Sequence, residues 1–347
     1  MSSASPPRAS RPPPSPEPKT YTVGGLPVHV YGLERLGQGE GRRRDVAVLF
    51  LLHGRLGRAS HPLISTFANR LVAGPESSPP RQEGDLDLVV VTFDQRNHGH
   101  RVVDYERNLG WREGGKMRDQ ERKERGVRDD ELDNESHAVD MMAIQTGTAR
   151  DVSFLIDFLP PVLFPHDERH VQEWYCAGIS LGGHATWLAL GHDPRISLGI
   201  PIIGSPSTLT LLSDRAQSLA PCLGGPLPVS GPFFPSTFVS LLDRVDPSNL
   251  PIESTWKGKK VLVLSGQDDE LVPFEKGGTS AFVERLRTEA GLDRLDVWVQ
   301  PNTGHACTPE MMARSTEFVW KHGLSCRRRR GSGGGGGGQA GSAGGKL

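Results

Sequence analysis

Short apolar runs recur along the chain, and each has the length of a β-strand. The runs span 45–53, 86–94, 174–180, 198–205, 260–266 and 295–300. They are continuous rather than alternating, which is typical of strands that are covered on both faces. Residues 21–31, with Gly24 and Gly25 in a turn, predict a hairpin that precedes them.

Stretches of helical length separate these runs. In 137–159 the apolar residues recur on roughly one face of a helix. Shorter helices are predicted at 62–73, 182–191, 277–290 and 309–321. Because strands alternate with helices, the sequence predicts an α/β fold with a mostly parallel sheet flanked by helices.

Two segments interrupt this alternation. Residues 112–135 contain 16 charged side chains of both signs, which predicts a solvated insertion. Residues 206–256 contain eight prolines and several apolar pairs, and they lie between two predicted core strands. An open α/β sheet tolerates a cap at that point, over its active edge. The apolar pairs suit an acyl-binding cap and suit ordinary packing of a long excursion equally well.

The ends differ in composition from the rest of the chain. Residues 1–19 form a Pro/Ser-rich tail, and residues 327–347 form an Arg/Gly-rich tail. Such segments bury too little apolar surface to offset their conformational entropy. We therefore expect a single folded domain over 20–326, with a disordered tail on each side.

Charge and composition exclude some classes of partner. The 40 Lys and Arg residues against 41 Asp and Glu give a net charge of -1, which argues against nucleic acid and anionic membranes. No apolar run approaches the ~20 residues of a membrane span. The N-terminal residues lack the apolar segment of a secretory signal, so a cytoplasmic location is expected. Gly345-Lys346-Leu347 differs by one residue from the S-K-L address, which leaves a peroxisomal location as the alternative.

The strongest chemical motif is Gly178-Ile179-Ser180-Leu181-Gly182-Gly183, between a predicted strand and a predicted helix. A sharp turn there lifts the serine hydroxyl clear of the sheet and points the N–H of Leu181 at a developing oxyanion. The alternative is an ordinary glycine-rich connection. Strand, turn and helix in this order favour a nucleophile.

A serine needs a base and an acid to act as a nucleophile. Asp268 and Asp269 follow the strand that ends at Gly266, and His305 follows the strand that ends near Gln300. Functional groups of parallel sheets gather at the carboxyl ends of the strands. The chain order of serine, acid and histidine therefore predicts that the three groups meet.

These motifs resemble the α/β-hydrolase family over nearly all of 21–322. His53-Gly54 resembles the family's HG turn, and residues 94–99 are similar to its D-x-R-x-x-G turn. Gly266 to Pro273 matches G-x-x-D-x-x-V-P, which implies Asp269 rather than Asp268 as the acid. The resemblance further implies an oxyanion hole formed by the backbone N–H groups of Arg55 and Leu181.

The resemblance implies a serine hydrolase that cleaves a small carboxylic ester through an acyl-enzyme, without metal or cofactor. It is strongest to the carboxylesterase and prolyl-oligopeptidase-like branches. Two alternatives stay open: a peptidase or acylaminoacyl hydrolase, and a non-catalytic binding protein that kept the fold. The oligomeric state is not predicted.

Five further side chains near these turns have weaker signals. Arg55 is expected to extend to solvent, although an Arg55 that faced the pocket would favour a substrate with a carboxylate. Asp94 and Arg96 are expected to form a pair that fixes their turn. His98 and His100 resemble a metal pair only superficially.

Overall fold

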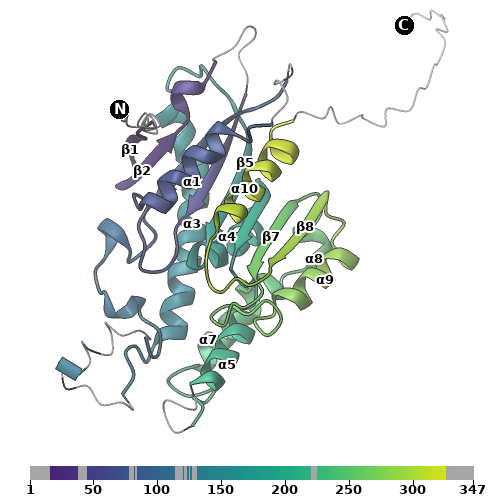
Figure 1. Cartoon of the computed structure of the whole chain (residues 1–347). Coiled ribbons are helices and arrows are strands. Elements are labelled where there is room, and N and C mark those ends of the chain that lie inside the picture. Colours follow the sequence, from purple (N-terminus) through teal and green to yellow (C-terminus); the bar gives the residue numbers. More distant parts are fainter. Residues whose placement is uncertain are drawn as a thin grey trace, which may run out of the picture.

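An eight-stranded sheet forms the centre of the molecule in the computed structural model (Figure 1). The structure describes residues 16–37, 45–77, 82, 84–113, 120, 123–124, 126, 131–219 and 225–325. Both predicted tails lie almost wholly outside these residues, as does much of the charged segment 112–135. The strands are ordered β1-β2-β4-β3-β5-β6-β7-β8 across the sheet.

The strands match the apolar runs of the sequence. β1 and β2 form the predicted antiparallel hairpin, and β2 is also antiparallel to β4. The pairs from β4 through β3, β5, β6 and β7 to β8 are all parallel. The strands are β1 (Lys19–Val23), β2 (Leu26–Tyr31), β3 (Val46–Leu52), β4 (Asp87–Phe93), β5 (Val171–Ile179), β6 (Ile196–Ile202), β7 (Lys260–Gly266) and β8 (Arg294–Gln300). Every residue of β3 and β4 is buried, as their continuous hydrophobicity predicts.

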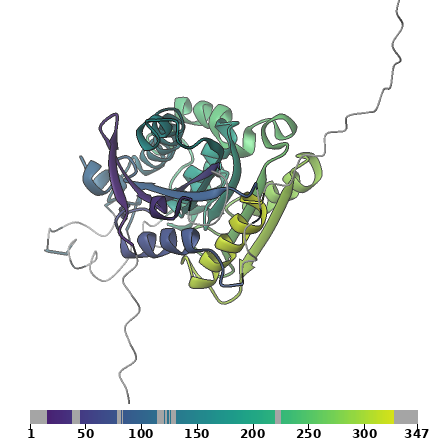
Figure 2. The same cartoon turned by 90° about the horizontal axis from the view of Figure 1, so that it is seen from above.

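Helices cover both faces of the sheet, as the view in Figure 2 shows. α1 (Pro62–Ala73) and α10 (Pro309–Phe318) lie on one face, and their apolar side chains form one core with it. The other face is covered by α3 (His137–Leu163), α4 (Leu181–His192), α8 (Ile252–Trp256) and α9 (Thr279–Glu289). A mostly parallel sheet flanked by helices confirms the predicted fold class.

The long helix α3 extends further than its sequence predicts. Pro160 and Pro161, which normally break a helix, lie inside it, and the helix ends at Leu163 rather than at Leu159. Leu163 and Phe164 are buried in the core beneath the helix. Their burial outweighs the backbone hydrogen bonds that the two prolines remove.

Residues 206–256 contribute a separate group of helices. They contain α5 (Thr208–Ser218) and α7 (Ser236–Val245), which lie together at one end of the molecule in Figure 1, followed by a short 3-10 turn and α8. The segment leaves the sheet after β6 and returns at β7. The carboxyl ends of these two parallel strands therefore lie beside it.

Short 3-10 turns fill the remaining connections. They are Leu33–Arg35, Gly99–Arg101, Glu106–Asn108 and Pro247–Asn249, and a π-helical turn, Val319–Gly323, follows α10. Among the described residues, no helix has the length and apolar character needed to cross a membrane.

Candidate active site

Ser180 occupies the tight turn between β5 and α4. Its backbone has φ 55° and ψ −109°, a conformation that costs energy for any residue with a side chain. The Ser180 N–H donates to the carbonyl of Ile202 on the neighbouring strand β6 at 2.9 Å, which helps to hold the turn. The strained backbone therefore presents the hydroxyl at the carboxyl edge of the sheet.

The glycines around Ser180 are required by close packing. A Cβ on Gly182 would lie 2.5 Å from the carbonyl oxygen of Leu52, and a Cβ on Gly178 would collide with the backbone of Gly182. Both positions therefore accept only glycine without a shift of the backbone. This explains why the motif has glycine on both sides of the serine.

Ser180, His305 and Asp269 meet in a hydrogen-bonded series. Ser180 Oγ lies 2.8 Å from Nε2 of His305, and Nδ1 of His305 lies 2.8 Å from Oδ2 of Asp269. The three residues come from the turn after β5 and from the loops after β7 and β8. The structure thus brings together all three side chains that the sequence selected, across 125 and 36 positions.

The loop after β7 distinguishes Asp269 from Asp268. Asp269 is buried, and its Oδ1 accepts hydrogen bonds from the N–H groups of Leu271 and Val272 at 3.0 and 2.8 Å. Asp268 is exposed. Burial by itself would raise the pKa of Asp269, but the hydrogen bond and charge of His305 and the two amides bring it below its usual value. Asp269 is therefore an ionised carboxylate that can orient the imidazole.

The turn after β3 packs directly against the turn that contains Ser180. A Cβ on Gly54 would lie 3.8 Å from Cβ of Ser180, and the Gly182 N–H donates to the carbonyl of His53 at 3.1 Å. Leu181 is the first residue of α4, so its N–H has no acceptor within the helix. Gly54, the residue before Arg55, and Leu181 therefore both lie next to Ser180.

A neutral histidine fixes this turn. Burial lowers the pKa of His53 to about 4. Its Nε2 accepts the N–H of Gln95 at 3.1 Å, while its Nδ1–H donates to Gly54 at 2.8 Å. The Gln95 side-chain amide also donates to the carbonyl of His53. These bonds join the ends of β3 and β4.

The Arg55 side chain does not extend to solvent, so that expectation is wrong. Its two terminal nitrogens pair with the two carboxylate oxygens of Glu113 at 2.7 and 2.8 Å, and it also donates to the carbonyl of Asn108 at 2.9 Å. Only 18% of the Arg55 side chain and 20% of the Glu113 side chain are exposed. The pair forms because Glu113, at the start of the charged segment, folds back onto the site.

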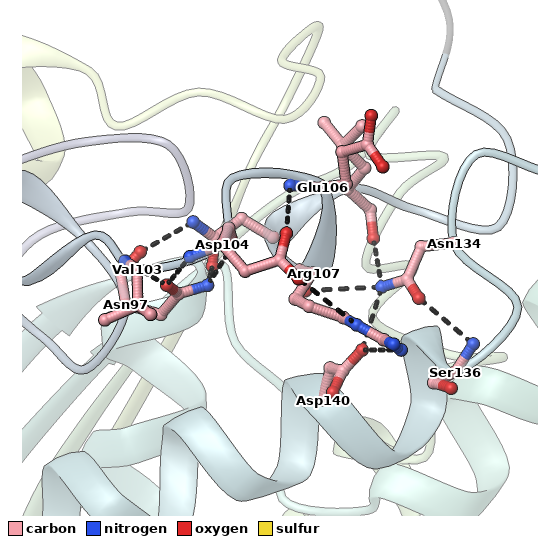
Figure 3. A network of polar contacts seen from close by, with 10 residues as sticks. Asn97, Val103, Asp104, Glu106, Arg107, Asn134, Ser136 and Asp140 are labelled. Carbon is pink, nitrogen blue, oxygen red and sulfur yellow. Dashed lines mark hydrogen bonds and ion pairs between the residues drawn. The ribbon is translucent and has the colours of Figure 1, made fainter.

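A polar network fixes the segment that supplies these partners (Figure 3). Oδ1 of Asn97 accepts the N–H groups of Val103 and Asp104, at 2.9 and 3.0 Å. The Asn134 amide donates to the carbonyl of Arg107 at 3.2 Å and to Asp140 at 3.1 Å. The loop between β4 and α3 is thus tied to the start of α3.

The expected pair of Asp94 and Arg96 does not form. Asp94 instead accepts the N–H groups of Ala59 and His100, and it also bonds the His100 ring at 2.9 Å. Arg96 pairs with Asp151 on α3 at 3.0 Å. A buried carboxylate takes amide donors when these are closer, so Asp94 fixes the turn without the arginine. Among the described residues, no three potential metal ligands come together, at His98 and His100 or elsewhere.

Some residues around the triad carry no motif and were missed. His184, one turn into α4, is buried, and burial lowers its pKa to about 4. Arg215 of α5 and His137 of α3 contact each other beside the acid loop. No local pattern marks Arg215, His137 or Glu113, because their partners are far away in the chain.

Comparison with known proteins identifies the architecture. No protein-family model and no curated protein matches the chain. TT1662 from Thermus thermophilus is similar in structure, with a TM-score of 0.54 and 18% identity over 88% of this chain and 98% of that chain. Puromycin hydrolase is also similar, with a TM-score of 0.53 and 14% identity over 88% of this chain, which matches 38% of that protein. Together with the strand order and the parallel core of the sheet, these similarities identify the chain as an α/β-hydrolase fold.

Proposed function

We propose that the protein is a serine hydrolase that cleaves a small carboxylic ester through an acyl-enzyme on Ser180. The observation that carries this proposal is the pair of 2.8 Å contacts that link Ser180 to His305 and His305 to Asp269. An α/β-hydrolase fold alone does not determine a reaction, so the proposal rests on these side chains.

In the proposed first step, His305 takes the proton of Ser180 as its oxygen attacks the carbonyl carbon. Asp269 holds the imidazole so that Nε2 faces the serine, and it stabilises the imidazolium that forms. The tetrahedral oxyanion develops beside Gly54 and the start of α4. The N–H groups of Arg55 and Leu181 are the proposed donors to it, and one such donor contributes about 3 kcal/mol.

Collapse of the intermediate releases the alcohol, which receives its proton from His305. Water then enters, and His305 removes its proton as the water attacks the acyl group. The acid leaves and Ser180 regains its proton. Every proton in this cycle passes through Nε2 of His305, and Asp269 stays ionised throughout.

A fluorophosphonate probe tests the proposal directly, since it phosphonylates activated serines. We expect it to label the wild-type protein and not Ser180→Ala. Ser280→Ala, in α9, is the matched control and should be labelled like the wild type. Absence of labelling in the wild type would favour the non-catalytic alternative.

The choice between an ester and an amide needs a second comparison. We expect p-nitrophenyl acyl esters to be cleaved with a higher kcat/KM than aminoacyl anilides. The opposite preference would assign the protein to the peptidase or acylaminoacyl hydrolase alternative.

A further inference from the structure

A second arginine lies beside the triad, at the end of helix α5. Nη2 of Arg215 donates to the carbonyl of Leu271 at 2.8 Å, and the N–H of Leu271 in turn donates to Oδ1 of Asp269 at 3.0 Å. The Arg215 guanidinium thus contacts the loop that contains Asp269. Its charge also contributes to the lowered pKa of His184, as does that of His305.

The partner of Arg215 on the other side is a neutral histidine. Nδ1–H of His137 donates to the carbonyl of Leu109 at 2.8 Å, and its Nε2 accepts from Nη1 of Arg215 at 3.1 Å. Burial, together with the charges of Arg215 and Arg55, keeps the pKa of His137 well below its usual value. His137 therefore accepts a hydrogen bond without offsetting the charge of the arginine.

No carboxylate forms an ion pair with Arg215 among the described residues, although the charges of Glu113, Asp269 and Asp214 act on it from farther away. None of the ion pairs within 4.0 Å in that part of the chain includes it, and its buried Nε has no hydrogen-bond partner there. Burial, followed by the charge of Arg55, lowers the pKa of Arg215 to about 10, so it is still a cation at neutral pH. A cation with a buried, unpaired donor is unfavourable until an anion reaches it.

Arg55 differs from Arg215 because it already has a carboxylate partner. Its guanidinium is already bound by both oxygens of Glu113. A substrate carboxylate would have to displace Glu113 to reach Arg55, whereas among the described residues Arg215 has no paired carboxylate to displace. An Arg55 that faced the pocket would have favoured substrates with a carboxylate. We therefore consider Arg215 instead of Arg55 for this role.

We propose that Arg215 binds a carboxylate carried by the substrate, so that the preferred substrates are esters with a free carboxylate near the scissile bond, such as monoesters of dicarboxylic acids. This rests on the proposed hydrolase function. Arginine suits the role because its planar fork binds carboxylates through charge-assisted hydrogen bonds.

The test compares esters that differ only in charge. Monoethyl succinate and monoethyl glutarate are paired with ethyl butyrate and ethyl pentanoate, in which a methyl group replaces the carboxylate. A second pair, O-butyryl glycolate and its amide, carries the charge on the alcohol side. The measured quantity is the ratio of kcat/KM values within each pair.

The expected change in the ratio of kcat/KM values is that of losing one charged hydrogen-bonding group. In at least one series, Arg215→Gln should lower the ratio of anionic to neutral ester by about 10- to 100-fold. Arg215→Lys, which keeps the charge, should lower it less. Arg244→Gln is the matched control, because Arg244 is an exposed arginine in the last turn of α7, and it should leave the ratio unchanged. Equal ratios for wild type and Arg215→Gln in both series would overturn the proposal.

A binding measurement separates this inference from the hydrolase function. In the Ser180→Ala background, NMR titration should show monoethyl succinate binding about 10-fold or more tightly than ethyl butyrate. Arg215→Gln in the same background should remove that difference. Equal affinities for the two esters in Ser180→Ala would refute the carboxylate site even if the wild type is labelled by the fluorophosphonate. A difference that disappears with Arg215 would support it even if the wild type is not labelled.

Discussion

In the proposed mechanism Ser180, His305 and Asp269 act on one proton, so their contributions should not add. We expect Ser180→Ala and His305→Ala each to lower kcat by about four to six orders of magnitude, with the double variant hardly worse than either. Steady-state kinetics on a p-nitrophenyl ester measures this. Losses that add in the double variant would mean that the two side chains act in separate steps.

The two adjacent aspartates should respond very differently. Asp269→Asn leaves the geometry nearly intact but removes the charge that orients His305, so kcat should fall by about 10⁴. Asp268→Asn changes an exposed side chain and should be mild. The same ester assay measures both. A severe loss in Asp268→Asn with a mild one in Asp269→Asn would place the acid at the other residue.

For single residues, the sequence allowed a prediction wherever the chemistry requires a local pattern. Gly178 and Gly182 flank Ser180 because side chains there would collide with neighbouring backbone atoms. Such a local constraint can be recognised from the sequence alone. The partner of Arg55 was not predictable, because Glu113 is 58 positions away within a run of similar charges. Arg215 lies in a segment without any motif, so only the folded chain reveals its neighbours.

Helix α5 begins on a buried carboxylate whose ionisation should affect stability. Asp246 accepts the N–H groups of Thr208 and Leu209, and burial raises its pKa to about 7. The unfolded chain releases this proton near pH 4, whereas the folded protein keeps it until about pH 7. This contribution to stability is therefore present at low pH and is lost as the pH rises through 7.

Asp246→Asn should remove that part of the pH dependence. Relative to wild type, the variant should gain stability between pH 5 and pH 8, by an amount on the order of a few kcal/mol. Urea denaturation at both pH values gives the free energies of unfolding. Asp243→Asn, an exposed change on α7, is the control. If wild type and Asp246→Asn keep a constant difference across this range, Asp246 is ionised in the folded protein.

The elements themselves were largely predictable, since continuous apolar runs and helical periodicity report burial directly. The end of α3 was not, because Pro160 and Pro161 give a strong local stop signal. Packing of Leu163 and Phe164 against the core overrides that signal, and packing depends on distant residues. The pairing of Asp94 with amides rather than with Arg96 has the same cause.

For the whole molecule, buried neutral histidines contribute to the loss of stability in acid. Burial lowers the pKa values of His53 and His184 to about 4, from 6.5. As the pH falls from 6.5 to 4, the unfolded chain takes up protons at these positions and the folded protein does not. Stability present above pH 6.5 is therefore lost, on the order of 3 kcal/mol per histidine.

His184→Gln should reduce this loss, because a glutamine does not titrate in either state. We expect the free energy of unfolding to fall less between pH 7 and pH 4.5 than in wild type, measured by urea denaturation. His192→Gln, a change at the end of α4, is the control. Asp246 acts in the opposite direction over an overlapping range, so both variants are compared with wild type at each pH. An unchanged slope in His184→Gln would show that another group dominates acid unfolding.

The order of the strands has a consequence for synthesis of the protein. The serine directly follows β5, but the imidazole follows β8, 125 positions later. A ribosome that has already made Ser180 must therefore add 125 further residues before the imidazole exists. Under the proposed function, a nascent chain or fragment that stops before His305 carries the hydroxyl without the base that would activate it.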